Sequence, residues 1–447
     1  MAKTGMYVGL DIGTTSVKVV VAEYIDSQMN IIGVGNAKSE GINRGVVVDI
    51  DKTVQAIQRA IRQAEEKAGI QIKGVSVGLP ANLLEVENCQ GMIAVNSESK
   101  EITDEDVRNV ASAALVRSIP PERQIVAILP QEFTVDGFDG IRDPRGMIGV
   151  RLEMFGTVFT GPKTMVHNIR KCVEKAGLIV NELVITPLAL TETILSDGEK
   201  DFGTIVIDMG GGQTTTSVMH DKQLKYTNVD QEGGEFVTKD ISIVLNTSFN
   251  NAEALKINYG DAFPERASSN EEFPVDVIGQ SEPVKVDERY LSEVIEARME
   301  QIFQKAKKSL DQIEALELPG GIVLTGGAAS LPGVVDLAQE IFGTNVKLYV
   351  PNQMGLRNPV FTNVISIVDY SANLTDIYQL AKLAITGETA VAQQNVMQQD
   401  VDFSPYEDIE EPTYQQQTPD SDSEPEEKKS GTSVVNKVKG FFGNIFE

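Results

Sequence analysis

A strand–turn–strand pattern occurs twice in this chain, and the repetition constrains the fold more than any other feature. The first copy runs from Asp11 to Thr15 and reads DIGTT, and the second runs from Asp208 to Thr215 and reads DMGGGQTT. Each copy follows one apolar strand and precedes another. The spacing between the copies is far longer than the period of a solenoid repeat. We therefore predict two related lobes that face each other.

The glycines and threonines of the two turns predict a binding site for phosphate. A glycine at the bend leaves successive backbone N–H groups pointing into one concavity, which suits phosphate oxygens. An aspartate at the head of each turn would repel a bare phosphate, so Asp11 and Asp208 are predicted to face Mg²⁺, directly or through its waters. Lys18, on the strand after the first turn, is predicted to reach the phosphates. The predicted phosphate ligands of these two segments are Gly13, Thr14, Thr15, Lys18, Gly210, Gly211, Gly212, Thr214 and Thr215.

A third glycine turn, from Thr325 to Ala328, follows an apolar strand and precedes a helix that is expected to run to about Phe342. Glycines at this position let the backbone approach a flat ring closely. A single turn of this kind is weak evidence, because Asp-Gly turns close many hairpins. The three turns in this order form a specific signature for nucleotide binding.

These turns resemble the two phosphate loops and the adenosine loop of the actin-like ATPase superfamily. Within that superfamily the chain is most similar to the FtsA family of bacterial cell-division proteins, from Met6 to about Gly387 and again at the extreme C-terminus. The resemblance implies an α/β, actin-like two-lobed ATPase fold with a duplicated core and an inserted subdomain of the FtsA type. It also implies that ATP and Mg²⁺ bind between the lobes.

The resemblance adds further site residues. Gly233 and Gly234 resemble a turn that faces the phosphates, and Glu253 and Lys256 match a helix that touches the nucleoside. The alternative for the second pair is an ordinary ion pair on a solvated helix face. The predicted nucleoside ligands are Glu253, Lys256, Thr325, Gly326, Gly327 and Ala328.

A departure from the superfamily pattern occurs at Thr186, which stands directly before Pro187 in the segment that resembles the connection between lobes. Hydrolytically active relatives often place Glu or Gln there to orient the attacking water. We can assign no such residue, so no catalytic residue is named. We expect slow ATP hydrolysis at most, with the nucleotide acting chiefly on lobe closure and polymerisation.

The domain organisation is predicted from the same pattern. Only a short segment separates Val34 from the helix that opens at Asp51, which leaves no room for the small subdomain that actin and MreB carry there. An extra α/β block later in the chain fits the relocated subdomain of FtsA. The predicted parts are 1–82 and 163–198 for the first-lobe core, 83–162 for the inserted subdomain, 199–226 and 311–387 for the second-lobe core, and 227–310 for the smaller subdomain of the second lobe.

The composition changes sharply after about Gly387. Residues 388–432 are rich in Gln, Ser, Thr, Pro and acids and are predicted to form an acidic disordered linker. Residues 433–447 place apolar residues on one helical stripe flanked by lysines, which predicts an amphipathic helix lying in the plane of a membrane. The alternative is a terminal helix docked on the protein's own core. The predicted membrane-binding residues are Val434, Val435, Lys437, Val438, Lys439, Phe441, Phe442, Ile445 and Phe446.

The charge and the cysteine content exclude several classes of protein. A net charge of −26 repels nucleic-acid phosphates, so no nucleic-acid partner is expected. Cys89 and Cys172 belong to no CxxC pair, and with His167 and His220 as the two histidines no zinc site is expected. We find neither a signal segment nor an apolar run long enough to span a membrane.

The function implied by the resemblance is that of a divisome adaptor on the cytoplasmic face of the cell membrane at the division site. Such a protein would bind the C-terminal tail of FtsZ through residues 227–310, assemble with itself into an actin-like polymer and contact later division proteins. Arg298 and Lys305 are expected on the exposed side of a helix in that region. Two alternatives remain open, a metabolic kinase of the acetate or sugar type and an FtsA-like adaptor of pilus or secretion machinery.

Overall fold

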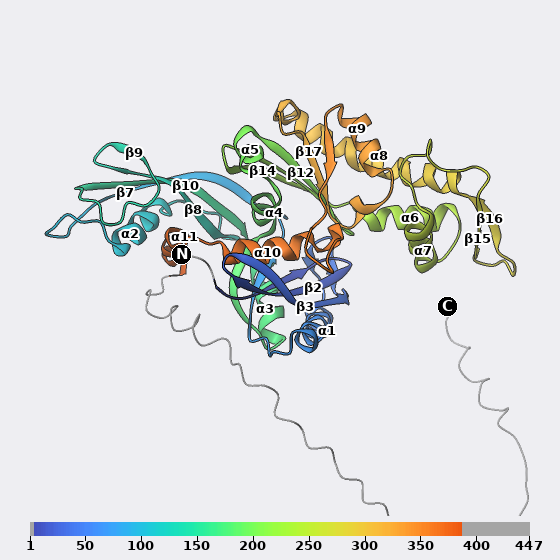
Figure 1. Ribbon diagram of the computed structural model, residues 1–447, viewed down its shortest axis with the longest axis horizontal. Coiled ribbons are helices and arrows are strands. Elements are labelled where there is room, and N and C mark those ends of the chain that lie inside the picture. Colours follow the sequence, from blue (N-terminus) through green and yellow to red (C-terminus); the bar gives the residue numbers. More distant parts are fainter. Residues whose placement is uncertain (1–3, 387–447) are drawn as a thin grey trace, which may run out of the picture. The chain divides into compact units, whose positions relative to one another are not determined.

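The computed structural model describes residues 4–386 (Figure 1). The predicted linker at 388–432 and the predicted membrane helix at 433–447 lie outside the described residues. Within residues 4–386, none of the helices combines the length and the apolar character needed to cross a bilayer.

Five strands form the first sheet, in the order β11-β6-β1-β2-β3. They are β1 (Gly5–Ile12), β2 (Ser16–Ile25), β3 (Gln28–Lys38), β6 (Gly74–Leu79) and β11 (Ile179–Ile185). β1 pairs antiparallel with β2 and parallel with β6. Val19 and Val21 of β2 point to one face and Val20 to the other, and all three are fully buried, so both faces of this sheet are covered.

Three helices cover the two faces of the first sheet. They are α1 (Ile50–Ala68) and α3 (Lys163–Lys175) on one face and α10 (Thr362–Ala372) on the other (Figure 1). The Asp49 side chain caps α1 by accepting from the Lys52 N–H, and Gly69 ends the helix in the left-handed conformation. A Cβ on Gly35 of β3 would lie 1.8 Å from the Ala60 carbonyl oxygen, so only glycine lets this strand approach α1 so closely.

The second sheet repeats this arrangement with strands in the order β14-β13-β12-β17-β18. They are β12 (Thr204–Met209), β13 (Thr214–His220), β14 (Gln223–Asp230), β17 (Ile322–Thr325) and β18 (Val346–Leu348). β12 pairs antiparallel with β13 and parallel with β17, as β1 does with β2 and β6. The duplication predicted from the two turns is therefore present in the strand order.

Helices and a small hairpin complete the second lobe. They are α5 (Asp197–Phe202), α6 (Gly234–Val244), α7 (Phe249–Tyr259), α8 (Glu288–Asp311), α9 (Val334–Phe342), the hairpin strands β15 (Glu272–Val275) and β16 (Val284–Asp287), and the short 3-10 helices Ala315–Glu317, Ala328–Ser330 and Pro359–Phe361. α8 and α9 pack on one face of the second sheet. On the other face, Leu190 and Ile194 of α4 (Thr186–Ile194) pack against Val206 and Val323. α4 thus joins the two lobes.

The inserted subdomain is a separate sheet in the order β7-β10-β8-β9 with one helix of its own. Its elements are β7 (Glu85–Ala94), α2 (Asp104–Ala114), β8 (Arg123–Val135), β9 (Phe138–Ile141) and β10 (Arg151–Pro162). Thr103 and Asp106 form a reciprocal capping box at the start of α2. The acids at this helix start therefore have a structural role.

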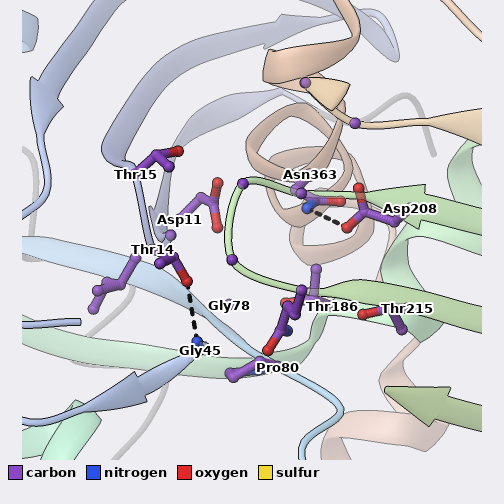
Figure 2. Close-up of a pocket in the computed structure, with 18 of the residues that line it drawn as sticks. Asp11, Thr14, Thr15, Gly45, Gly78, Pro80, Thr186, Asp208, Thr215 and Asn363 are labelled. Carbon is purple, nitrogen blue, oxygen red and sulfur yellow. Dashed lines mark hydrogen bonds between the residues drawn. The ribbon is translucent and has the colours of Figure 1, made fainter. Parts of the chain in front are cut away.

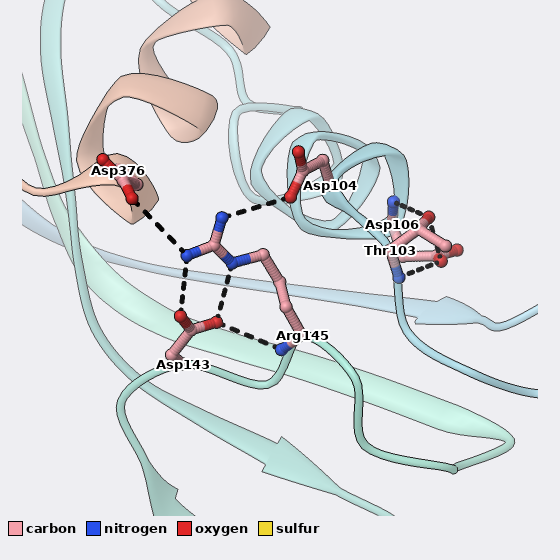
Figure 3. A network of polar contacts seen from close by, with 6 residues as sticks. All are labelled: Thr103, Asp104, Asp106, Asp143, Arg145 and Asp376. Atoms are coloured by element: carbon pink, nitrogen blue, oxygen red, sulfur yellow. Dashed lines mark hydrogen bonds and ion pairs between the residues drawn. The ribbon is translucent and has the colours of Figure 1, made fainter.

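The last described helix, α11 (Asp376–Thr386), packs on the inserted subdomain. Its Leu380, Ala381 and Leu383 are buried in the same core as residues of α2, β8 and β10. Near its start, Arg145 pairs with Asp376 at 3.9 Å and bonds Asp104 at 3.2 Å and Asp143 at 2.8 Å (Figure 3). The Arg145 guanidinium also holds the pKa of the Asp143 carboxyl below its ordinary value.

The positions of α10 and α11 correct one predicted boundary. The sequence pattern predicts residues 311–387 as second-lobe core, but α10 packs on β1, β2 and β6, and α11 packs on α2 and β8. After the 3-10 helix Pro359–Phe361 the chain therefore returns to the first lobe and the inserted subdomain. The apolar pattern of these helices predicts burial, and it does not say which sheet buries them.

Candidate functional site

A pocket lies between the two sheets, where the two predicted phosphate turns meet (Figure 2). It receives most of the residues predicted to bind phosphate, magnesium or nucleoside. The predicted residues that line it are Asp11, Gly13, Thr14, Thr15, Lys18, Asp208, Gly210, Gly211, Gly212, Thr215, Gly326 and Gly327. The structure thus brings together segments that are far apart in the sequence.

The two turns have the same hydrogen bond and lie in direct contact. The Gly13 N–H donates to the Ser16 carbonyl at 3.1 Å, and the Gly210 N–H donates to the Gln213 carbonyl at 2.9 Å. A Cβ on Gly211 would lie 2.2 Å from Thr15 Cγ2. The absence of a side chain at Gly211 is therefore what allows the two turns to approach each other.

Two carboxylates enter the pocket from equivalent register positions. Asp11 pairs with Lys18 across β1 and β2, as Asp208 pairs with Thr215 across β12 and β13. The Lys18 Nζ lies 3.2 Å from the Asp11 Oδ2, and both side chains are mostly buried. Asp208 Oδ2 accepts from Asn363 Nδ2 at 2.8 Å (Figure 2).

The donor set at this point suits a hard cation. Asp11 and Asp208 supply carboxylate oxygens, and the buried Asn363 Oδ1 has no hydrogen-bond donor among residues 4–386. Oxygen ligands of this kind are those that Mg²⁺ takes, with waters and phosphate oxygens completing its shell. No group of three or more His, Cys, Asp or Glu side chains in the described part of the chain forms a metal site by itself.

Burial raises the pKa of Asp208 from 3.8 to about 6, and the nearby Asp11 charge acts in the same direction while the Asn363 hydrogen bond opposes it. The folded protein therefore binds this proton more tightly than the unfolded chain. Below about pH 4 the Asp208 carboxyl does not lower the free energy of unfolding. Above about pH 7 it lowers that free energy by about 3 kcal/mol in protein free of Mg²⁺ and nucleotide.

We predict that Asp208→Asn removes this pH dependence, because the amide keeps the shape of the protonated carboxyl without ionising. Thermal unfolding of wild type and variant, measured without Mg²⁺ from about pH 4 to about pH 7, tests the prediction. The variant should gain stability over wild type as the pH rises. An equal pH dependence in the two proteins would contradict it.

Three residues predicted to bind phosphate do not line the pocket. Thr214 Oγ1 donates to the Glu232 carbonyl at 2.9 Å. Gly233 and Gly234 lie at the start of α6, where the Gly234 N–H donates to the Gly210 carbonyl at 3.0 Å. These residues hold the second turn in place, and contact with a phosphate stays a prediction for them.

The helix pair Glu253 and Lys256 also lies away from the pocket lining. The Lys256 Nζ donates to Glu253 Oε2 at 2.7 Å, to Thr238 Oγ1 at 2.7 Å and to the Gly234 carbonyl at 3.1 Å. Lys256 is buried, so this i, i+3 pair is not an ordinary ion pair on a solvated helix face, and it links α7 to α6. Its predicted nucleoside contact stays a prediction.

The third glycine turn reaches the pocket in part. Gly326 and Gly327 line it, whereas Thr325 is fully buried and donates to Thr362 Oγ1 at 2.8 Å, and Ala328 is buried beside it. Gly326 has φ +93°, and a Cβ there would lie 2.4 Å from Asp208 Oδ1. Only glycine fits between this turn and the carboxylate.

Several lining residues were not predicted from the sequence. They are Ile12, Gly45, Gly78, Pro80, Ala81, Leu190, Gln213, Pro359, Val360 and Asn363. Gly78 lies near the end of strand β6 and Pro80 follows that strand directly, and β6 lies next to β1, so the strand end was a usable signal. Asn363 carries no local signal, because only the packing of α10 brings it to Asp208. Thr186 and Pro187, noted in the connecting segment, also line the pocket.

Comparison with known proteins identifies the family. The models described as "Cell division protein FtsA", "SHS2 domain inserted in FTSA" and "Cell division protein FtsA, C-terminal" match residues 205–366, 82–160 and 377–447. A cell division protein FtsA of Enterococcus hirae is 84% identical over 450 residues, with 100% of each chain covered. The chain belongs to the FtsA family.

More distant relatives agree with this assignment. A cell division protein FtsA of Escherichia coli strain K12 is 35% identical over 379 residues, which cover 82% of this chain and 90% of that one. A solved structure, a PilM-PilN type IV pilus biogenesis complex, superposes with a TM-score of 0.57 at 16% identity over 83% of this chain and 99% of the other, which shows the fold alone.

Membership in the FtsA family confirms the predicted family, the actin-like α/β fold with its inserted subdomain, and the role in cell division. It also decides between the alternatives, since a relative in the FtsA family matches the whole chain at high identity. Neither the metabolic kinase nor the pilus adaptor is retained.

Proposed function

We propose that this protein is an ATP- and Mg²⁺-binding adaptor that tethers the FtsZ ring to the cytoplasmic face of the membrane at the division site. One observation carries the proposal: two glycine turns, each headed by an aspartate, meet at a single pocket in a member of the FtsA family. Such turns offer backbone N–H groups to a polyphosphate from both sides.

In this proposal each part of the pocket has a distinct role. Backbone N–H groups and threonine hydroxyls of the two turns hold the phosphates, and Lys18 adds a positive charge. Asp11 and Asp208 face Mg²⁺, whose charge offsets that of the phosphates. Gly326 and Gly327 leave room for the nucleoside. Because the ligands come from both lobes, a bound nucleotide acts on the angle between them and thereby on self-assembly.

The FtsZ tail is proposed to dock on the smaller subdomain of the second lobe. Four large apolar side chains are exposed around the turn that follows α6, namely Ile243 (65%), Val244 (47%), Phe249 (44%) and Ile278 (64%). The Ile278 N–H donates to the Asn246 carbonyl at 2.8 Å, which places Ile278 beside the turn that follows α6. An exposed apolar cluster of this kind is typical of a protein-binding surface.

The two basic residues expected near this surface are not free to bind a partner. Arg298 is mostly buried and bonds Asp240 at 2.5 Å and Glu232 at 3.2 Å. Lys305 bonds Glu232 at 2.7 Å and lies 3.5 Å from Asp230. Lys305 lies on the exposed side of α8 as expected, whereas Arg298 does not, and both charges make contacts within the subdomain.

We predict that Ile243→Glu weakens FtsZ binding at least about tenfold, because it removes an apolar contact and buries a charge in the interface. Binding is measured with purified full-length proteins by sedimentation or surface-based titration. The matched control is Ile179→Glu, which changes an isoleucine of the first lobe that is also exposed (51%). Equal losses in the two variants, or none in the first, would place the FtsZ surface elsewhere.

The membrane attachment is proposed to reside in residues 433–447, and the predicted linker gives that segment its reach. A single helix of this length with Gly440 and Gly443 inside binds weakly, so self-assembly through the ATPase body would convert many weak anchors into firm attachment. Later division proteins are proposed as further partners of the inserted subdomain.

Sedimentation with liposomes and FtsZ, with and without ATP and Mg²⁺, tests the whole proposal. We expect FtsZ to pellet with liposomes only when this protein is present, and the amount to change with nucleotide. If FtsZ stays in the supernatant under all conditions, the adaptor role is wrong. If it pellets equally with and without nucleotide, the switching role of ATP is wrong.

A further inference from the structure

A short hairpin crosses from the first lobe towards the second beside the pocket. Its strands β4 (Ile42–Asn43) and β5 (Val46–Val47) are joined by the two residues Arg44 and Gly45. Both have positive φ, +49° and +73°, as a two-residue hairpin turn with its matching twist requires. An arginine in the left-handed conformation is uncommon.

Gly45 lies against both phosphate turns. Its N–H donates to Thr14 Oγ1 of the first turn at 3.1 Å (Figure 2). A Cβ at this position would lie 2.4 Å from Gln213 Oε1 of the second turn and 2.8 Å from Asn82 Oδ1. The tip of the hairpin therefore fits only if its second residue is glycine, and any separation of the two turns changes its surroundings.

Two acceptors beside Gly45 have no donor. The buried oxygens Asn82 Oδ1 and Gln213 Oε1 lack a hydrogen-bond partner among residues 4–386, although the Asn82 amide nitrogen donates to the Arg44 carbonyl at 3.2 Å. Buried acceptors are normally satisfied. The side of the tip that faces the pocket thus offers hydrogen-bonding capacity to a ligand or to the water around it.

The Arg44 side chain leaves the pocket and reaches the second lobe. Its guanidinium carbon lies 5.2 Å from the centroid of the Phe236 ring on α6, and its Nη1 donates to Gln231 Oε1 at 3.4 Å. Arg298 of α8 approaches the same ring at 5.6 Å. The Phe236 ring therefore contacts one arginine from each lobe, in contacts of the cation–π type.

Arg298 is held in place by ion pairs. Its guanidinium bonds Asp240 on α6 and Glu232 just before it, so α6 and α8 are tied together at this point. The same two helices carry the smaller subdomain, with Ile243 at the end of α6. A displacement of Phe236 relative to Arg44 is therefore a displacement of that subdomain relative to the first lobe.

We propose that Arg44 and Gly45 form a cross-cleft latch that couples the spacing of the two phosphate turns to the position of α6 and α8. Gly45 lies against both turns, beside Thr14 and Gln213, and Arg44 contacts Phe236. A change in the spacing of the turns therefore displaces Arg44 and, with it, Phe236. This latch rests on the proposed function, because a nucleotide is the ligand expected to change the spacing of the turns. Arg44 and Phe236 are positioning residues in this latch, since neither lines the pocket.

Hydrogen exchange of the full-length chain tests the latch. Exchange is measured with and without ATP and Mg²⁺ in wild type, in Arg44→Ala and in Phe236→Leu. We expect ATP to slow exchange at 11–18 and 208–215 in all three proteins, and to change exchange at 294–302 of α8 in wild type alone. The matched control, Arg62→Ala on the exposed side of α1, should respond as wild type does.

The possible outcomes are distinct. If α8 responds to ATP equally in wild type, Arg44→Ala and Phe236→Leu, the latch is wrong although nucleotide binding stands. If α8 does not respond in wild type while the two turns do, the latch is also wrong. If the turns themselves show no response in wild type, nucleotide binding fails, and with it the proposed function. Thermal unfolding of each variant without nucleotide shows whether it remains folded.

Discussion

Replacement of Gly211 by valine is expected to weaken binding of ATP with Mg²⁺ about a hundredfold. A side chain at this position would clash sterically with Thr15, because a Cβ on residue 211 would lie only 2.2 Å from Thr15 Cγ2. The two turns could then no longer offer their N–H groups to one polyphosphate. Loss of two charge-assisted hydrogen bonds at about 1.5 kcal/mol each gives about 3 kcal/mol, which is about two powers of ten in affinity. Titration calorimetry of the full-length variant measures the effect.

The matched control for this substitution is Gly198→Val. Gly198 lies in α5, and a Cβ there would meet nothing within 4 Å. The same chemical change is thus made in open space, and affinity for ATP should stay within a factor of about two of wild type. If Gly211→Val binds ATP as wild type does, the second turn does not hold the phosphates.

Deletion of residues 434–447 is expected to abolish sedimentation with anionic liposomes. The segment holds the predicted apolar stripe and both lysines, and burial of each large apolar side chain in lipid contributes roughly 1.5 to 3 kcal/mol before the cost of ordering the helix. Without it, the amount of protein in the pellet should fall to that of a sample lacking liposomes. The two-lobed body should keep its thermal unfolding midpoint, because the deletion lies outside residues 4–386.

A deletion of equal length within the predicted linker, residues 404–417, is the matched control. It shortens the tether but leaves the terminal segment intact, so liposome binding should persist. Full binding by the protein that lacks 434–447 would contradict the membrane role of the terminal helix. Loss of binding in both proteins would instead show that the linker itself is required.

The sequence was sufficient to predict the core of the fold and about half of the residues that line the pocket, because the relevant signals are local. Asp11 and Gly13 lie in one short turn, and Asp208 and Gly211 lie in its repeat, so the duplicated spacing could be recognised without structural information. Two strands with an equivalent turn must pair in equivalent ways, and β1–β2 and β12–β13 do so.

Contacts made by packing across large sequence separations could not be predicted in this way. Asn363 bonds Asp208 only because α10 returns to the first sheet, and the apolar pattern of α10 does not identify the sheet. Lys256 illustrates the same limit, since its spacing from Glu253 is that of an exposed pair although α6 buries it. The sequence around Gly45 indicates only an ordinary turn, and its contact with Thr14 arises from the packing of the hairpin.

Calorimetric titration of the full-length protein with ATP, in the presence of Mg²⁺ and again with the metal chelated, tests the central claim most directly. The paired turns and their aspartates predict a saturable heat with about one nucleotide bound per chain, and a marked loss of affinity once Mg²⁺ is removed. Titration without any heat of binding at concentrations up to the millimolar range would contradict the assignment of this pocket to ATP.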